Sequence, residues 1–233
     1  MVGRLKKTAT QRRLVLEIHA IGPRPSYIRP DEAYYWCEDL CLFDRILDAI
    51  PDVSARSGTP IEITFDDGNA SDFIFALPAL VKRGLVASFF VCAGRIGQAG
   101  YLDKKAMTEI VAAGMMIGSH GWSHIDWRNA DRQTLTKETE EAKHTIEDTI
   151  GKQIDSVAIP FGSYDRRVID SLKMFSKVYT SDGGLAPPRS RFIPRVSYNN
   201  DWSETTLSEL ASQRARGLAA FRRSALSTIK RTR

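Results

Sequence analysis

Short apolar runs alternate with longer amphipathic stretches along most of this 233-residue chain, and this alternation limits the possible folds more than any other feature. The apolar runs predict strands at 14–19, 61–65, 85–91, 115–119, 156–160, 177–181 and 192–197. The stretches between them predict helices at 31–50, 71–83, 103–113, 131–150, 165–175 and from about residue 204. Repeated strand–helix units place their strands in parallel, and about seven such units favour a barrel over a small open sheet. We therefore predict a single α/β domain with the architecture of a (β/α) barrel.

Basic residues are concentrated at both ends of the chain. The formal net charge is +5, and much of the excess lies near the two termini. We therefore divide the chain into a basic leader at 1–13, a barrel at 14–210 and a basic C-terminal tail at 211–233. The two ends either associate weakly with an anionic membrane surface or are simply solvated termini. No nucleic-acid motif accompanies the charge, so we expect no nucleic-acid partner.

Hydropathy argues against a membrane-spanning segment. Residues 1–20 contain no apolar stretch of the length that a secretory signal needs. No apolar run of about 18 residues, the length that spans a bilayer, occurs elsewhere in the sequence. The expected location is the cytoplasm, with peripheral contact to the inner membrane as the alternative. The sequence leaves the oligomeric state open.

Two adjacent carboxylates and two histidines provide the main functional signal. Asp66 and Asp67 directly follow one predicted strand, and His120 and His124 follow another. Neighbouring carboxylates repel each other unless a cation lies beside them. Two imidazoles and one carboxylate form the ligand set of a catalytic zinc that keeps a position open for water. These residues therefore predict a hydrolytic metal site.

In this interpretation Asp67, His120 and His124 hold the metal. Asp66 then stands beside the water as its general base. Zinc is the expected ion, although cobalt, nickel or iron suits the same donors. The alternative interpretation of the acidic pair is a polar turn, because Asp67-Gly68 is a common turn pair.

Other strand ends add residues to the same edge of the expected barrel. Catalytic groups of (β/α) barrels lie at the C-terminal ends of the strands. His19 ends the first predicted strand, and Asp182 follows a late one. Pro160 and Phe161 lie at the end of the predicted strand 156–160. We therefore expect these residues on one rim together with the acidic pair.

Three motifs together resemble the polysaccharide deacetylase family, which includes the nodulation chitooligosaccharide deacetylases. They are Thr64-Phe65-Asp66-Asp67-Gly68, then Ser119-His120 with His124, then Ile159-Pro160-Phe161-Gly162. The resemblance covers about residues 14–200, and its first two motifs are the more specific ones. It implies a distorted (β/α) barrel, a divalent metal that is usually zinc, and hydrolysis of an N-acetyl group from an amino sugar.

The resemblance also implies roles for individual residues. It makes Asp66 the base and assigns the metal to Asp67, His120 and His124. The backbone N–H of Phe161 falls where the family forms part of an oxyanion hole, which would stabilise a tetrahedral intermediate.

Substrate contacts are expected from residues near the same rim, and these are Trp122, Pro160, Tyr164 and Asp182. The aromatic rings of Trp122, Phe161 and Tyr164 would line a sugar-binding groove by stacking. Ordinary packing at the barrel rim is the alternative for each ring.

The chain departs from the family pattern at two catalytic positions. The family commonly has an arginine two residues before the proline of its third motif, where this chain has Ala158. Arg195 could replace it, and a surface or structural arginine is the alternative. The family also commonly has a late Leu-x-His that protonates the leaving amine, whereas no histidine follows His144 here. His19 is the substitute that we expect, because some members resembling exopolysaccharide deacetylases carry this histidine on an early strand. A neutral core or loop histidine is the alternative.

We therefore predict a metal-dependent hydrolase that removes N-acetyl groups from an amino-sugar glycan, in carbohydrate metabolism or exopolysaccharide biosynthesis. Its substrate would be an oligosaccharide, a polysaccharide precursor or a lipid-linked sugar. One alternative is a catalytically impaired relative of the same fold that binds metal or glycan as an interaction protein. Another is an amidase that uses the same residues on a non-sugar substrate.

Overall fold

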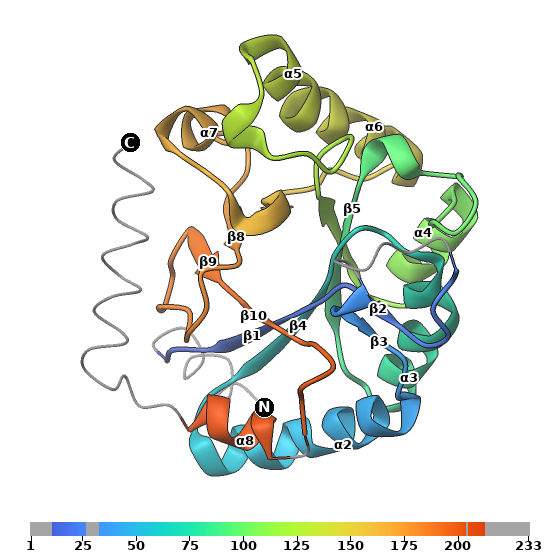
Figure 1. The fold of residues 1–233 in the computed structure, drawn as a ribbon, viewed down its shortest axis with the longest axis vertical. Coiled ribbons are helices and arrows are strands. Elements are labelled where there is room, and N and C mark those ends of the chain that lie inside the picture. Colours follow the sequence, from blue (N-terminus) through green and yellow to red (C-terminus); the bar gives the residue numbers. More distant parts are fainter. Residues whose placement is uncertain (1–10, 27–32, 204, 213–233) are drawn as a thin grey trace.

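The described part of the chain forms a parallel sheet that curls into a nearly closed barrel (Figure 1). The computed structural model describes residues 11–26, 33–203 and 205–212. Eight strands pair in the order β10-β1-β4-β5-β6-β7-β8-β9, and their pairings are parallel. Their bounds are β1 Leu14–Ile18, β4 Ile61–Phe65, β5 Ala87–Val91, β6 Met116–Ser119, β7 Ser156–Ala158, β8 Lys177–Thr180, β9 Phe192–Pro194 and β10 Val196–Ser197. The prediction of a (β/α) barrel is therefore confirmed.

The barrel closes at a seam between β9 and β10. These two strands lie at opposite edges of the sheet, yet only Arg195 separates them in the chain. β9 pairs with β8, and β10 pairs with β1, where Val196 lies opposite Leu16. The N–H of Arg195 donates to the carbonyl of Thr180 in β8 at 2.8 Å. The chain therefore crosses from one edge of the sheet to the other within a single residue.

Helices pack along much of the outer face of the barrel (Figure 1). They are α2 Leu40–Ser57, α3 Leu77–Lys82, α4 Lys104–Ala112, α5 Arg132–Thr136, α6 Ala142–Ile150, α7 Arg166–Ser171 and α8 Thr206–Ala211. The π-helical segment η2 Asp72–Ala76 precedes α3, and η5 Lys137–Glu141 joins α5 to α6 in one continuous helix. Short 3-10 turns, η3 Ala93–Arg95, η4 Trp127–Asn129 and η6 Pro160–Gly162, follow β5, β6 and β7. The helices expected after the second strand are therefore confirmed, with boundaries shifted by a few residues.

Alternation along the strands separates two apolar cores. Leu14 and Leu16 of β1 belong to the large core that includes the helices, whereas Val15 between them belongs to a smaller inner cluster. The inner cluster consists of Val15, Phe90, Ala158, Tyr179, Ala186 and Ile193. The Arg195 guanidinium lies over it, 5.6 Å from the ring centroid of Phe90 and 5.9 Å from that of Tyr179. The barrel interior thus has an apolar floor beneath a polar layer.

The single helix that the sequence predicts at 31–50 is wrong, because a short strand interrupts it. Residues 27–32 lie outside the described part of the chain. Trp36–Cys37 is a short strand, β3, that pairs in parallel with β2, Ala20–Ile21. The indole N–H of Trp36 donates to the Gly22 carbonyl at 2.8 Å, so the segment is fixed beside β2 rather than continuing a helix.

The predicted end of this helix at Pro51 is also wrong. α2 begins after Asp39, whose carboxylate accepts the N–H of Leu42 at 2.8 Å. The helix continues past Pro51 until Gly58, with a left-handed φ of 68°, ends it. Pro51 is exposed, whereas Val53 beyond it is buried in the core. Burial of the following turn therefore outweighs the local preference of proline for a helix end.

The basic leader and tail that the sequence predicts lie mostly outside the described residues. Arg13, assigned to the leader, bonds through its N–H to the Ala186 carbonyl at 3.1 Å and forms an ion pair with Glu62 at 2.8 Å. Ala211, assigned to the tail, is buried, and its carbonyl accepts the Thr59 hydroxyl at 2.9 Å. Arg13 and Ala211 thus both contact the barrel, and the division of the chain into leader, barrel and tail stays a prediction.

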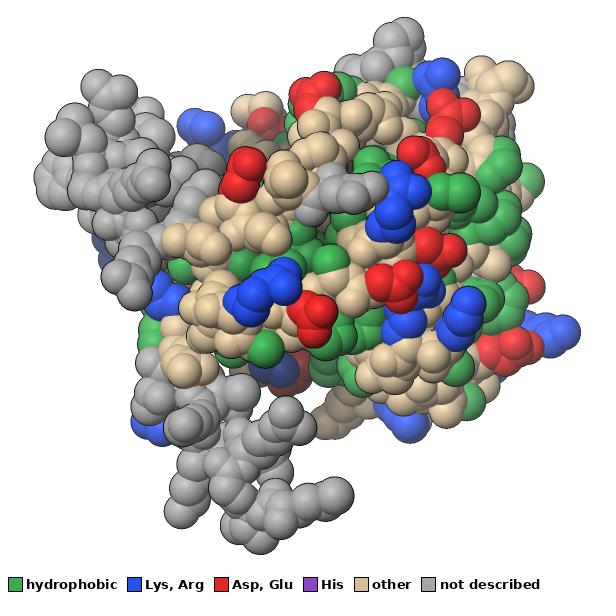
Figure 2. Space-filling model, turned by 90° about the horizontal axis from the view of Figure 1, so that it is seen from below, with side chains coloured by type: hydrophobic (Ala, Val, Ile, Leu, Met, Phe, Trp, Pro, Cys, Tyr) green, Lys and Arg blue, Asp and Glu red, His purple; other side chains and the backbone are tan. Residues whose placement is uncertain are grey.

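No helix within the described ranges is long and apolar enough to cross a bilayer. On the face seen in Figure 2, acidic and basic side chains are interspersed with apolar ones.

Candidate metal and catalytic site

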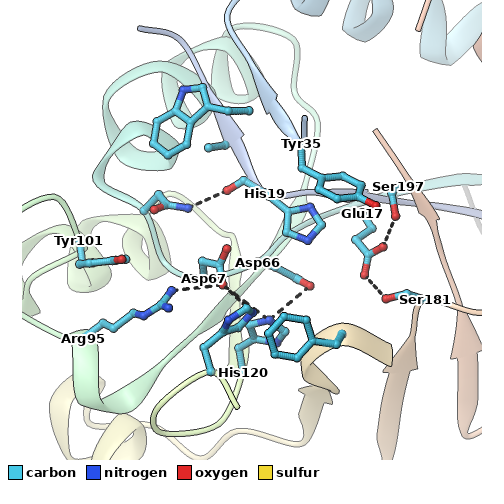
Figure 3. Close-up of a pocket in the computed structure, with 15 residues that line it drawn as sticks. Glu17, His19, Tyr35, Asp66, Asp67, Arg95, Tyr101, His120, Ser181 and Ser197 are labelled. Atoms are coloured by element: carbon cyan, nitrogen blue, oxygen red, sulfur yellow. Dashed lines mark hydrogen bonds and ion pairs between the residues drawn. The ribbon is translucent and has the colours of Figure 1, made fainter. Parts of the chain in front are cut away.

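The C-terminal ends of the parallel strands surround one pocket (Figure 3). His19 follows β1, Asp66 and Asp67 follow β4, and His120 follows β6. The pocket is lined by Glu17, His19, Ala20, Tyr35, Trp36, Asp66, Asp67, Asn69, Arg95, Tyr101, His120, His124, Phe161, Ser181 and Ser197. The pocket therefore includes every residue that the sequence predicted as a metal ligand or a catalytic group.

Asp67, His120 and His124 place one ligand atom each around a common point. These three atoms lie within 4.8 Å of one another. Asp67 Oδ1 is 3.2 Å from His124 Nε2 and 3.8 Å from His120 Nε2. Two donors that bind a tetrahedral ion at about 2.1 Å lie about 3.4 Å apart. The spacing of the three donors therefore fits a small divalent ion such as zinc.

The surroundings of these donors favour metal binding by orienting one histidine and by setting the pKa values of the other two residues. His120 Nδ1 lies 2.9 Å from the Ala158 carbonyl, which can only accept, so Nδ1 donates and Nε2 is the ring nitrogen that faces the two aspartates of the pocket. Burial lowers the pKa of His124 to about 4, so its imidazole is neutral near pH 7. Burial disfavours the charged form of Asp67, but the nearby imidazoles and Arg95 hold its pKa below the ordinary carboxyl value.

Backbone strain is concentrated at the same pocket. Within the described ranges four non-glycine residues have positive φ, and three of them line the pocket: Asp67 at 74°, His124 at 55° and Phe161 at 57°. This left-handed conformation costs an L-residue about 1–2 kcal/mol. Such strain persists where the surrounding structure holds it, and it clusters at functional sites. The backbone geometry therefore marks this rim independently of the side-chain chemistry.

Asp66 lies beside the donor set and is held by an arginine. Its two carboxylate oxygens accept hydrogen bonds from the two terminal nitrogens of Arg195 at 2.6 and 2.8 Å. His120 Nε2 is 3.7 Å from Asp66 Oδ2. Burial disfavours the charged carboxylate, but the Arg195 guanidinium outweighs this effect and lowers the pKa of Asp66 below its usual range. Asp66 is therefore ionised and fixed in orientation.

Arg195 is the residue that the sequence offered as a replacement for the arginine absent at Ala158. Its side chain lies inside the barrel and is fully buried, so the alternative of a surface arginine is wrong. Its second carboxylate partner is Glu17, whose Oε1 lies 2.5 Å from Nη2. The Ser181 and Ser197 hydroxyls each donate to Glu17 at 2.5 Å. The buried guanidinium of Arg195 is thus paired with the carboxylates of Asp66 and Glu17, and Glu17 also accepts hydrogen bonds from two serines.

In Figure 3, Asp66 lies between His19 and His120. One of the ring nitrogens of His19 is within 4.8 Å of one carboxylate oxygen of Glu17 and one of Asp66. Its ring packs against Tyr35 with 5.0 Å between the centroids. Its Nδ1 is buried and makes no hydrogen bond to any described residue. His19 is therefore a pocket histidine with unused hydrogen-bonding capacity.

Four residues predicted to contact substrate do not line the pocket: Trp122, Pro160, Tyr164 and Asp182. Tyr164 is buried, and its hydroxyl donates to Asp182 at 2.6 Å. Pro160 is buried too, and Trp122 packs against the outer core with Lys137 Nζ 4.7 Å from its ring centroid. A strand end brings the backbone to the rim, but the side chain can still turn away from the pocket. The pocket geometry gives their predicted role no support.

Several lining residues were missed in the sequence. Arg95 Nη1 lies 3.3 Å from Asp67 Oδ1, and its guanidinium lies 4.9 Å from the ring centroid of Tyr101. Arg95 ends a turn that follows β5. Residues that follow the C-terminal end of a barrel strand lie near the pocket, and this rule, applied to β5, indicates Arg95. Tyr35 comes from the segment mistaken for a helix, and nothing local in the sequence identifies it. The other missed residues are Glu17, Ala20, Trp36, Asn69, Ser181 and Ser197.

Comparison with known proteins agrees with the motifs. A family model described as polysaccharide deacetylase matches residues 54–177, just over half of the chain. YxkH of Bacillus subtilis, a candidate polysaccharide deacetylase, is 28% identical over 107 residues, which cover 46% of this chain and 38% of YxkH. The chitin deacetylase of Pestalotiopsis sp. is 28% identical over 110 residues, which cover 47% of this chain and 37% of that protein. The matched segment thus spans less than two-fifths of either relative.

A solved structure extends the likeness over the barrel. The deacetylase PplD of Streptococcus pyogenes, in complex with acetate, superposes with a TM-score of 0.74 at 21% identity. The superposition covers 87% of this chain and 99% of that chain. At this level of identity the likeness establishes the fold.

Proposed function

The chain belongs to the polysaccharide deacetylase family, and from this membership we propose that it is a metal-dependent hydrolase that removes N-acetyl groups from an amino-sugar glycan. The observation that carries the proposal is the convergence of Asp66 with the donors Asp67, His120 and His124 at one pocket. An oligosaccharide, a polysaccharide precursor and a lipid-linked sugar are the candidate substrates. A cytoplasmic location remains a prediction from the sequence.

Asp67, His120 and His124 would hold the ion. Zinc suits this donor set best, and cobalt, nickel or iron shares its preference for imidazole and carboxylate. When bound, the ion would acidify a water molecule and polarise the acetamide carbonyl. The neutral state of His124 and the hydrogen bond from His120 to the Ala158 carbonyl support this assignment.

Asp66 is the candidate general base. The two hydrogen bonds from Arg195 keep its carboxylate oriented and ionised, so it can accept a proton from water. The same bonds make Asp66 a weak base, and proton transfer to it therefore requires an acidified water. Arg195 would thus take the orienting role that the family gives to the arginine missing at Ala158.

His19 is the candidate general acid, and the backbone N–H of Phe161 is the candidate oxyanion donor. The proximity of His19 to Asp66 supports a proton transfer to the leaving amine at this side of the pocket. The strained backbone of Phe161 supports a specialised role, because a positive φ of 57° is retained at a residue that is 60% exposed. The Phe161 ring also packs against His124 with 4.6 Å between the centroids.

Aromatic side chains support a sugar as the substrate. Tyr35, Trp36, Tyr101 and Phe161 all line the pocket. Aromatic faces bind the apolar faces of sugar rings and leave the hydroxyl groups for polar neighbours. Among the lining residues, Asn69 and the two serines Ser181 and Ser197 provide such polar groups.

The proposal is tested by measuring bound metal and acetate release together. We expect the purified wild-type protein to hold one divalent ion per chain and to release acetate from N-acetylchitooligosaccharides. Asp66→Asn should retain the ion and lose about a hundredfold to ten-thousandfold in turnover, because only the base is removed. His124→Ala should lose both the ion and activity, since one of three ligands is gone.

His144→Ala is the matched control, because the His144 side chain is 75% exposed on α6 and should be indifferent to metal. Absence of a bound ion after zinc is supplied would overturn the proposal. A tightly bound ion without acetate release from any N-acetylated glycan would instead favour the catalytically impaired interaction protein.

A further inference from the structure

The loop that carries His120 and His124 folds around a buried carboxylate that comes from outside the pocket. Glu138, in η5, is 1% exposed and is not among the residues that line the pocket. Its Oε2 accepts the backbone N–H of Trp122 at 2.8 Å, and its Oε1 accepts that of Ser123 at 2.9 Å. One side chain thus binds two consecutive peptide groups between the two histidines.

A third donor completes the site around Glu138. The indole N–H of Trp127, a residue with no exposed surface, donates to Glu138 Oε2 at 3.1 Å. All three donors are N–H groups, and an ionised carboxylate only accepts, so Glu138 matches them fully. A glutamine of the same shape would turn its NH2 group toward at least one of these donors. The donor set therefore selects a carboxylate over its amide.

The loop packs so closely against Glu138 that no side chain fits at Gly121. Gly121 has a φ of 82°, and a Cβ added there would lie 2.5 Å from Glu138 Oε2 and 3.0 Å from Trp127 Cζ2. On the other side of the loop the carbonyls of Gly121 and Trp122 accept the N–H groups of Ala93 and Gly94 at 2.8 and 3.0 Å. The segment between the histidines is therefore held from both sides.

This fixation has a direct bearing on the donor geometry. His124 keeps a left-handed φ of 55°, a conformation that the chain does not adopt without support. Its Nε2 nevertheless lies 3.2 Å from Asp67 Oδ1, so the strained backbone delivers the imidazole to the shared point. Glu138 anchors the peptide groups that immediately precede this residue.

We propose that Glu138 is a positioning residue that sets the metal affinity and coordination geometry of the pocket, although it contacts neither the ion nor the substrate. The inference rests on the proposed metal site at Asp67, His120 and His124. It assigns to the α5–η5–α6 helix a function beyond packing, because this helix holds the loop that supplies two of the three ligands.

The test compares Co²⁺ binding by wild type, Glu138→Gln and Glu141→Gln, followed by the visible absorption spectrum of the bound ion. Glu141 lies in the same η5 segment but is exposed, so Glu141→Gln is the matched control. We expect Glu138→Gln to weaken Co²⁺ binding about 10- to 100-fold and to alter the spectrum, with unchanged far-UV circular dichroism. The control should bind Co²⁺ and absorb light as wild type does.

A folded Glu138→Gln protein with the wild-type Co²⁺ affinity and spectrum would overturn the inference and leave the proposed function intact. Failure of the wild type to bind Co²⁺ would overturn both. If Glu138→Gln does not fold, Trp127→Phe replaces it, because this change removes one donor to Glu138 and keeps an aromatic ring in the core. We expect Trp127→Phe to weaken Co²⁺ binding several-fold, and an affinity equal to that of wild type would contradict the positioning role.

Discussion

Arg195 is a cation buried in the barrel interior between two carboxylates, Asp66 and Glu17. Burial disfavours its charge, but the two carboxylates more than compensate and raise the pKa of Arg195 above its ordinary value. A buried ion pair of this kind adds little net stability compared with an apolar cluster, but removal of one partner leaves an unpaired buried charge. The conformation of the candidate base therefore depends on a single residue.

Arg195→Met should lower the free energy of unfolding by about 3–5 kcal/mol, because both carboxylates then remain buried without their cation. Arg195→Lys should fall between wild type and Arg195→Met, since one ammonium cannot form the two parallel bonds to Asp66. Urea denaturation measures both changes. Lys105→Met is the control, because the Lys105 side chain is 84% exposed and its ion pair with Glu109 is long at 4.0 Å. Equal effects at positions 195 and 105 would show that the buried pairing is not needed.

Whether the sequence can predict a contact in the site depends on how far apart the two contacting residues lie along the chain. Asp66 and Asp67 are adjacent, and His120 and His124 share one loop, so a local motif could predict them. Arg195 lies 129 positions from Asp66, and no local pattern connects the two. Only the closure of the barrel brings them together, and the sequence does not reveal which residue occupies the seam.

Among the elements, α2 shows how packing controls a helix end. Pro51 lacks the N–H that would bond to the carbonyl one turn earlier, which normally ends or kinks a helix. α2 nevertheless extends to Ser57, because Val53 and the preceding turns bury apolar side chains against the barrel. The local preference of proline predicted that the helix ends at Pro51. The residues around the proline do not indicate the tertiary burial that extends the helix.

Pro51→Ala should therefore raise the free energy of unfolding by about 1–2 kcal/mol. The alanine restores a backbone hydrogen bond and removes the steric conflict of the ring, while the loss of proline rigidity in the unfolded chain offsets part of the gain. Urea denaturation again provides the measurement. Asp52→Ala, at the neighbouring exposed position, should change stability by less than about 0.5 kcal/mol. A loss of stability in Pro51→Ala would mean that the proline is part of the packing of α2.

At the scale of the whole molecule, the barrel interior consists of an apolar floor and a polar layer that opens to the pocket. The alternating pattern of the strands could predict the barrel itself, because the pattern recurs in every strand–helix unit. The pattern could not predict the pocket walls, since Tyr35 and Tyr101 come from connecting segments whose conformation no periodicity defines. Three candidate ligands come from two strand ends, so a bound ion would tie together parts of the barrel that are distant in sequence.

Metal should accordingly stabilise the entire fold. At an ion concentration of 100 times Kd, binding to the folded state alone adds about 2.7 kcal/mol to the free energy of unfolding. For a chain of this size that corresponds to a rise in Tm of about 5–10 °C. Differential scanning calorimetry with Zn²⁺ and with a chelator measures the difference. His124→Ala should unfold at the same temperature under both conditions, and a metal-dependent Tm in this variant would contradict the ligand assignment.

The seam between β9 and β10 has a consequence for how copies of this protein behave towards one another. An open parallel sheet presents two rows of unpaired backbone groups, and each row can recruit a strand from another molecule. Here the two outermost strands are consecutive in one chain and are joined by a single residue, so they meet across the gap instead of standing apart. The same residue that orients the candidate base thereby joins the two edge strands within one molecule, an arrangement that disfavours edge-to-edge pairing between molecules.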